Sequence, residues 1–150
     1  MEISKEGFKM TKGMDGSITL LFDTKRSDEC AKFAFKNNIR IISLYPGIYV
    51  SKDLSPLFEI KDFIEGLLLD ENVEYSKLIS FKNLKFLSIP DNKKDVIDLS
   101  NFPELEILAC DFSDRLKGLE NANKLRSLTI SNYKSKNKNF VSRGVSHGFM

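Results

Sequence analysis

The feature that most constrains the fold is a pattern of leucine and isoleucine that returns every 20 to 25 residues. Five segments follow L-x-x-L-x-L spacing, with starts at residues 39, 64, 84, 105 and 125. A period of this length indicates a repeat protein, in which stacked neighbours bury apolar faces that no single unit can bury. The apolar triplets are Ile39/Ile42/Leu44, Ile64/Leu67/Leu69, Leu84/Leu87/Ile89, Leu105/Leu108/Cys110 and Leu125/Leu128/Ile130.

A second apolar pair precedes each of the last three triplets, six and three residues before the triplet begins. Because the offset is the same each time, we expect these residues to fill the core behind the strands. The pairs are Leu78 and Phe81, Leu99 and Phe102, and Leu119 and Ala122.

This spacing resembles the leucine-rich-repeat family, in the short-repeat type common in bacterial proteins, over roughly residues 38 to 132. The resemblance implies an α/β fold: a leucine-rich-repeat solenoid with a parallel β-sheet on its concave face. We expect about five repeats in residues 39–132, preceded by an N-terminal β-hairpin and helix cap in residues 1–38.

The cap is predicted from turn and helix signals within residues 1–38. A turn over 12–16 separates two short strand-like runs, 8–10 and 18–22, which indicates a hairpin. A helix is expected to follow, with Ser27 as its N-cap and Asn37-Asn38 at its end. Its expected buried face comprises Cys30, Ala31, Ala34 and Phe35.

Charge is distributed unevenly along the chain, although the net charge is only +2. Residues 51–120 carry nine basic and fifteen acidic side chains, whereas residues 121–150 carry six basic and no acidic ones. The acidic middle favours a basic partner. Residues 133–150 form a basic tail that we expect to be flexible, because its scattered apolar residues cannot bury enough surface.

The positions between the inward-facing triplets predict a binding surface, because side chains on a strand alternate between faces. One predicted row across the strands contains Ile41, Gly66, Phe86, Ile107 and Ser127, and its large apolar members indicate an interface. The next row is mostly small apart from Leu68, and aromatic and acidic residues follow the strand ends. The predicted partner-binding residues are Ile41, Tyr45, Leu68, Asp70, Phe86, Asp91, Ile107, Asp111 and Phe112.

A further row alternates in charge sign: Arg40, Glu65, Lys85, Glu106 and Arg126. With strands about 4.8 Å apart, neighbours in this row should form ion pairs that set the stacking register. An alternative for the apolar row is that it is covered by the tail or by a second copy of the chain.

The sequence contains little that suggests catalysis or metal binding. The single histidine, His147, lies in the basic tail without a partner at a useful spacing, and no phosphate-binding or Cys-x-x-Cys motif occurs. Asp91, Asp95 and Asp98 are interrupted by two lysines, which indicates a solvated turn rather than a cation loop. We therefore expect no catalytic residues, no metal and no cofactor. Cys30 and Cys110 are expected to remain reduced, with Cys110 in the core.

The sequence thus predicts a protein-interaction module that binds a protein partner, with a preference for a basic one, through its concave face. An inhibitor or immunity-type protein is the more specific hypothesis. Two alternatives remain: a structural segment of a larger or degenerated repeat array, and weak nucleic-acid binding through the basic tail. Neither a leader nor a membrane span is evident, so we expect a cytoplasmic protein.

Overall fold

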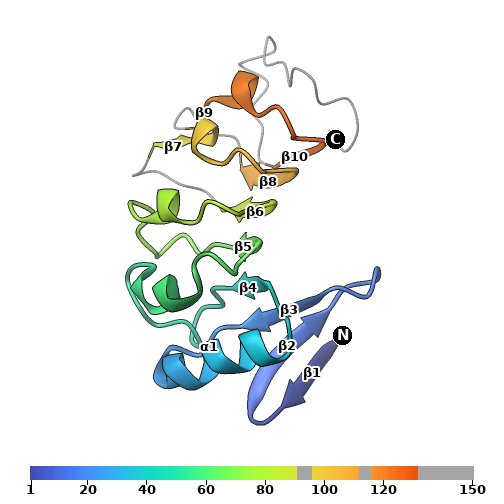
Figure 1. Cartoon of the computed structure of the whole chain (residues 1–150), viewed down its shortest axis with the longest axis vertical. Coiled ribbons are helices and arrows are strands. Elements are labelled where there is room, and N and C mark those ends of the chain that lie inside the picture. Colours follow the sequence, from blue (N-terminus) through green and yellow to red (C-terminus); the bar gives the residue numbers. More distant parts are fainter. Residues whose placement is uncertain (91–95, 112–115, 132–150) are drawn as a thin grey trace.

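The computed structural model describes residues 1–90, 96–111 and 116–131. Eight strands form one open, mostly parallel sheet in the order β1-β2-β3-β4-β5-β6-β8-β10. The first three strands pair antiparallel, and from β3 onwards each strand pairs parallel with the next. The fold is therefore mixed α/β, and its strands succeed one another along the long axis of the molecule (Figure 1).

The strands of the sheet are short, and each sequence repeat contributes one of them. They are β1 (Glu2–Lys5), β2 (Phe8–Lys12), β3 (Ile18–Leu21), β4 (Ile41–Ser43), β5 (Gly66–Leu68), β6 (Phe86–Ile89), β8 (Ile107–Asp111) and β10 (Ser127–Ser131). Two further strands, β7 (Ile97–Asp98) and β9 (Leu116–Lys117), form a separate parallel pair. The helical elements are α1 (Ser27–Lys36) and the 3-10 helices η1 (Thr24–Arg26), η2 (Ser55–Ile60), η3 (Leu78–Ser80), η4 (Leu99–Asn101) and η5 (Leu119–Asn121).

A single aliphatic row runs across the parallel strands and forms the centre of the core. Its members are register partners, and each is fully buried: Leu20, Ile42, Leu67, Leu87, Leu108 and Leu128. All fifteen residues of the five predicted triplets belong to the core. Burying a leucine or isoleucine side chain contributes about 1.5–3 kcal/mol, so this row is a major source of stability.

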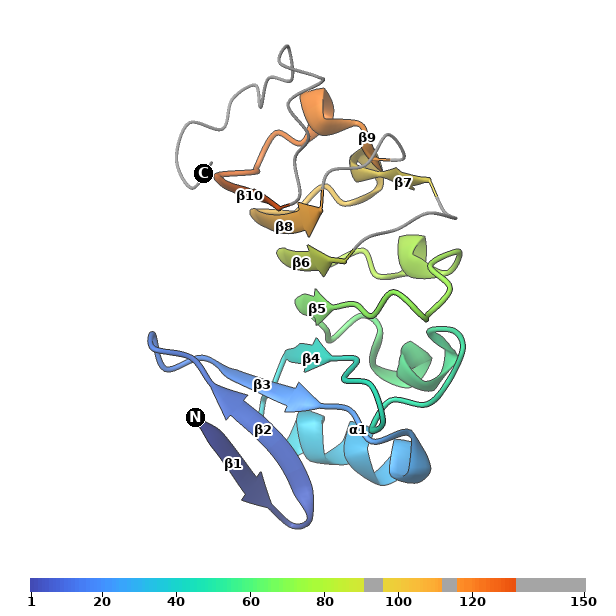
Figure 2. The ribbon, with the colours of Figure 1, turned by 180° about the vertical axis from the view of Figure 1, so that it is seen from behind.

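The second apolar pairs also lie where the pattern predicted. Leu78, Leu99 and Leu119 each begin a 3-10 helix, and the residue three positions later donates its backbone N–H to the carbonyl of that leucine. The first two pairs are buried and the third is half-buried. These helices occupy the side of each turn away from the strands of the large sheet (Figures 1 and 2).

The N-terminal segment forms the predicted hairpin and helix with three differences. An additional strand, β1, pairs with β2 at the edge of the sheet. Ser27 does not cap α1; its hydroxyl donates to the Thr24 carbonyl, and the Asp23 side chain caps η1 instead. Phe35 was expected on the buried face but is 68% exposed, because the helix turns Phe33 inward in its place.

The end of α1 agrees with the prediction. Asn37 is the C-cap residue, its side chain donates to the Phe33 carbonyl, and Asn38 has a positive φ of 54°. No helix within the described residues has the length and apolar character needed to cross a membrane.

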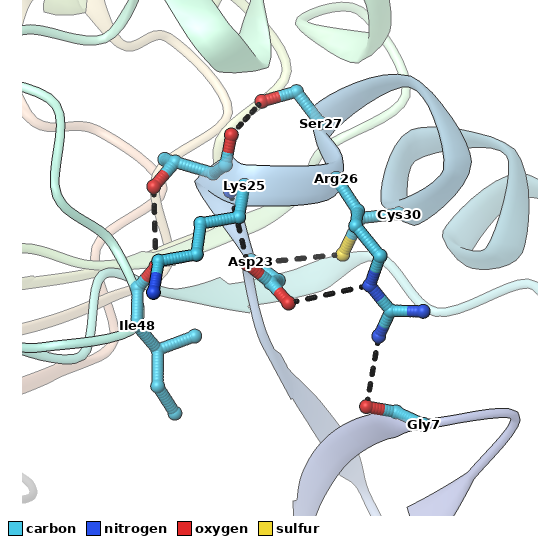
Figure 3. Close-up of polar contacts among 8 residues, drawn as sticks. Gly7, Asp23, Lys25, Arg26, Ser27, Cys30 and Ile48 are labelled. Atoms are coloured by element: carbon cyan, nitrogen blue, oxygen red, sulfur yellow. Dashed lines mark hydrogen bonds and ion pairs between the residues drawn. The ribbon is translucent and has the colours of Figure 1, made fainter.

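Arg26 joins the turn between β1 and β2 to the segment before α1 (Figure 3). Its Nη2 donates to the Gly7 carbonyl at 2.9 Å, and its Nε lies 3.5 Å from Asp23 Oδ2. The guanidinium carbon also lies 4.0 Å from the centre of the Phe8 ring. A Cβ at Gly7 would approach Arg26 Nη2 to 3.1 Å, so glycine permits this close contact. One side chain thereby fixes the β1–β2 turn against the segment that precedes α1.

Replacing Arg26 by methionine is expected to lower the free energy of unfolding by about 1–2 kcal/mol, because a charged hydrogen bond and a cation–π contact are lost from a partly exposed site. Urea unfolding followed by circular dichroism measures this change. Lys25→Met is the matched control, since Lys25 is an exposed neighbouring cation. It should change stability by less than about 0.5 kcal/mol. Equal losses of stability in the two variants would show that the contacts of Arg26 do not hold the β1–β2 turn in place.

Candidate functional site

The candidate site is the open face of the parallel sheet, defined as the side opposite the buried aliphatic row. Strand pairing aligns the predicted row directly: Ile41 lies opposite Gly66, Gly66 opposite Phe86, Phe86 opposite Ile107, and Ile107 opposite Ser127. The side chains of Ile41, Phe86 and Ile107 are each half-buried. The structure thus brings three of the predicted binding residues into one row.

Gly66 makes this apolar row continuous rather than interrupting it. A Cβ at Gly66 would lie 3.1 Å from both Cγ atoms of Ile41 and 3.3 Å from Cδ2 of Phe86. The two large side chains therefore lean over the glycine from either side. We call Ile41, Gly66, Phe86 and Ile107 the apolar stripe.

The neighbouring row consists mainly of small residues. Ser43, Leu68, Ser88, Ala109 and Thr129 are register partners along the sheet. Leu68 is half-buried and stands between two serines. Because most of these side chains are small, they leave space beside the apolar stripe in which a partner's side chain could lie.

In the charged row next to the apolar stripe, three of the four pairs of neighbours form the predicted ion pairs. Glu65 Oε2 lies 3.6 Å from Arg40 Nη1 and 3.9 Å from Lys85 Nζ. Glu106 Oε1 lies 3.2 Å from Arg126 Nε. These side chains are between about a third and two thirds exposed, so each pair stabilises the fold by no more than about 1 kcal/mol. Their charges are largely neutralised within the protein.

A further ion pair close to this row joins the last two repeats. Lys124 Nζ lies 2.7 Å from Glu104 Oε1. The hydrogen bond from Lys124 lowers the pKa of Glu104, and the same bond raises the pKa of Lys124.

The strand ends carry the remaining predicted residues. Tyr45 follows β4 and is 54% exposed, Asp70 follows β5 and is half-buried, and Asp111 is the half-buried last residue of β8. Neither Asp70 nor Asp111 forms an ion pair with any described residue. Pro90 occupies the corresponding position after β6. The predicted Asp91 and Phe112 lie outside the described residues.

Reactive groups are few in the described part of the chain. No cluster of three or more His, Cys, Asp or Glu side chains could hold a metal ion there. Cys30 and Cys110 are buried, and burial raises the pKa of each thiol to about 11. Both thiols therefore stay protonated at neutral pH, which makes them poor nucleophiles.

Of Asp91, Asp95 and Asp98, the structure describes only Asp98. Asp98 caps η4 by accepting from the Ser100 backbone N–H at 3.0 Å and from its hydroxyl at 2.6 Å. Asp91 and Asp95 lie outside the described residues, as does His147.

Comparisons with known proteins do not assign this fold and surface to a family. No protein-family model matches the chain. Neither the curated proteins nor the solved structures give a significant match. The class of protein must therefore be inferred from the architecture and the chemistry of the surface.

One surface feature was missed in the sequence. Phe35 lies against Phe63 with ring centres 5.3 Å apart, and the Arg40 guanidinium carbon lies 4.3 Å from the centre of the Phe63 ring. Lys32 lies three residues before Phe35 and four residues before Lys36, a spacing that makes Lys32 a neighbour of both on the helix surface. That spacing could have revealed the patch.

Proposed function

We propose that this chain is a leucine-rich-repeat solenoid that binds another protein through its open face. The architecture of one strand and one 3-10 helix per repeat supports the repeat class. The observation that carries the function is the continuous apolar stripe on an otherwise charged and small-residue surface. Contiguous apolar surface of this kind marks interaction sites.

The surroundings of the apolar stripe favour a basic partner. The charged row on one side is already paired within the protein, so it contributes little to affinity for a partner. On the other side, the carboxylates of Asp70 and Asp111 have no ion pair among the described residues. Residues 51–120, which carry most of this surface, have a net charge of −6. A partner with an apolar anchor and nearby lysine or arginine side chains would complement both features.

The more specific function within this class is an inhibitor or immunity-type protein that blocks a basic enzyme by covering its surface. An acidic, preformed binding face supports that assignment by analogy. Such a protein needs complementarity to one target and no catalytic groups of its own.

Replacing Phe86 and Ile107 together by glutamate should weaken partner binding at least about a hundredfold, because two apolar contacts are lost and burying two carboxylates against the partner's apolar anchor costs several kcal/mol. Lysate from the source organism is passed over immobilised wild-type and variant protein, and mass spectrometry identifies what only the wild type retains. Calorimetry with the purified partner then gives the affinities.

The matched control is Ile79→Glu/Val96→Glu, which adds the same charges at two exposed apolar positions outside the open face. This control should bind as the wild type does, and all three proteins should show similar thermal unfolding. Equal retention of the partner by Phe86→Glu/Ile107→Glu would exclude the open face as the binding site. Absence of any specifically retained protein would favour the structural-segment alternative.

A further inference from the structure

A second surface lies on α1, away from the apolar stripe. Phe35 is 68% exposed, whereas its neighbour Phe33 is 4% exposed and packs against Phe8 with ring centres 4.9 Å apart. Lys32 and Lys36 are also exposed: Lys32 lies one helical turn before Phe35, and Lys36 lies one turn after Lys32. We call Lys32, Phe35 and Lys36 the helix patch.

The exposed ring of Phe35 in the helix patch is supported on one side by neighbouring side chains. Phe63 packs against Phe35 with an angle of 52° between the rings, and Arg40 covers Phe63 in turn. Arg40 is itself held by Glu65 at 3.6 Å and by Asn38 Oδ1 at 3.0 Å. Phe35 is therefore supported on one side while its other side remains open to solvent. A preorganised aromatic group of this kind loses little side-chain freedom on binding.

The two lysines of the helix patch are available for a partner. Within the described ranges, neither Lys32 nor Lys36 forms an ion pair or a side-chain hydrogen bond. By contrast, Arg40 and Lys61 next to the patch are paired with Glu65 and Asp62. Two lysines without an ion pair to any described residue thus lie beside the exposed ring.

We infer that the helix patch is a docking site for an acidic protein segment that carries a bulky apolar side chain. The apolar side chain would lie on Phe35, and neighbouring carboxylates would pair with Lys32 and Lys36. This site goes beyond the proposed function, because it lies on a different element and selects the opposite charge from the open face.

Local acids favour a protein segment over a nucleic acid. Asp28 and Glu29 occupy the first turn of α1, and the exposed Asp62 adjoins Phe63. A run of phosphates crossing the helix patch would meet these carboxylates, whereas a peptide can place one or two carboxylates beside the lysines alone. A single exposed aromatic ring also provides no succession of stacking platforms for bases.

The test uses a fluorescein-labelled peptide with one phenylalanine between two pairs of glutamates, titrated by fluorescence anisotropy up to about 1 mM. Two comparison peptides replace phenylalanine by alanine or the glutamates by glutamines. We expect the full peptide to bind at least about tenfold more tightly than either comparison, since both the anchor and the charge contribute. Amide chemical shifts should change in α1 and around Phe63.

The variants separate the two contributions. Phe35→Ser should weaken binding at least about tenfold, whereas Met14→Ser, which removes a fully exposed apolar side chain elsewhere, should have no effect. Lys32→Glu/Lys36→Glu should lose the glutamate peptide and gain affinity for a lysine-flanked one, with thermal unfolding confirming that α1 remains folded. Phe86→Glu/Ile107→Glu should bind the peptide as the wild type does, so failure of the open-face proposal would not affect this one.

Three outcomes would overturn the inference. They are no saturable binding of the full peptide, equal binding by the Phe35→Ser variant, and tighter binding of an oligothymidylate strand that depends on the same residues. The last outcome would reassign the helix patch to single-stranded nucleic acid.

Discussion

Replacing Phe81 by alanine is expected to lower the free energy of unfolding by about 3–5 kcal/mol, because the side chain is completely buried and its removal leaves a cavity. The ring lies edge-on to Phe58 with ring centres 6.0 Å apart, so it links η2 and η3 behind the strands. A domain of ordinary stability has about 5–15 kcal/mol in total. The variant should therefore lose a large share of its stability, and the melting temperature should fall by roughly 10 °C.

Phe35→Ala is the matched control for this prediction, because it removes the same atoms from an exposed site. The ring contact with Phe63 is its main interaction, so the loss should be below about 1 kcal/mol. Chemical denaturation of both variants, with a common slope in the fit, gives the comparison. Similar losses at the two positions would mean that burial of Phe81 does not determine stability.

Replacing Gly118 by alanine should lower the free energy of unfolding by about 2–3 kcal/mol, for two reasons. Gly118 has a φ of 76°, which disfavours any residue with a Cβ. An added Cβ would also collide with Asp98 Oδ1 and lie 3.0 Å from the Ser100 backbone nitrogen. Since Asp98 caps η4 through these groups, the collision would disturb the cap as well.

Gly47→Ala separates the two causes. Gly47 has a φ of 91°, but an added Cβ would have nothing within 4 Å. It should therefore show only the backbone penalty, about 1–2 kcal/mol. Thermal and urea unfolding of both variants measure the difference. A loss at Gly118 no larger than that at Gly47 would show that the contact with Asp98 has no energetic role.

The repeating core was predictable because burial imposes a strict pattern. Every triplet residue faces inward to one shared core, so Leu67, Leu87 and Leu108 are recognisable in the sequence. The same constraint places Leu78 and Leu99 at the starts of 3-10 helices. The alignment of side chains on the open face follows directly, because each strand occupies the same positions of its repeat.

The N-terminal segment was less predictable, because its contacts are specific rather than periodic. Helical spacing allowed Phe35 at the margin of the buried face, and packing of Phe33 against Phe8 decides which phenylalanine turns inward. Ser27 has the residue type of an N-cap, but η1 continues directly into α1 and places the cap four residues earlier, at Asp23.

The open face shows the same division between pattern and detail. Its rows could be assigned from spacing, but the way Ile41 and Phe86 close over Gly66 depends on side-chain positions. The identity of the partner depends on a complementary surface that this sequence does not encode.

Each parallel strand of the large sheet pairs only with the strands of the preceding and the following repeat, and this makes the sheet extensible. Residues 64–83 contain one strand, one 3-10 helix and their connections. The strand, β5, pairs through equivalent positions with β4 on one side and with β6 on the other. A tandem copy of these twenty residues would add one strand and lengthen the sheet by about 4.8 Å without altering any existing layer. The breadth of the open face can thus change by gene duplication or deletion in whole steps, while the core on either side keeps its composition.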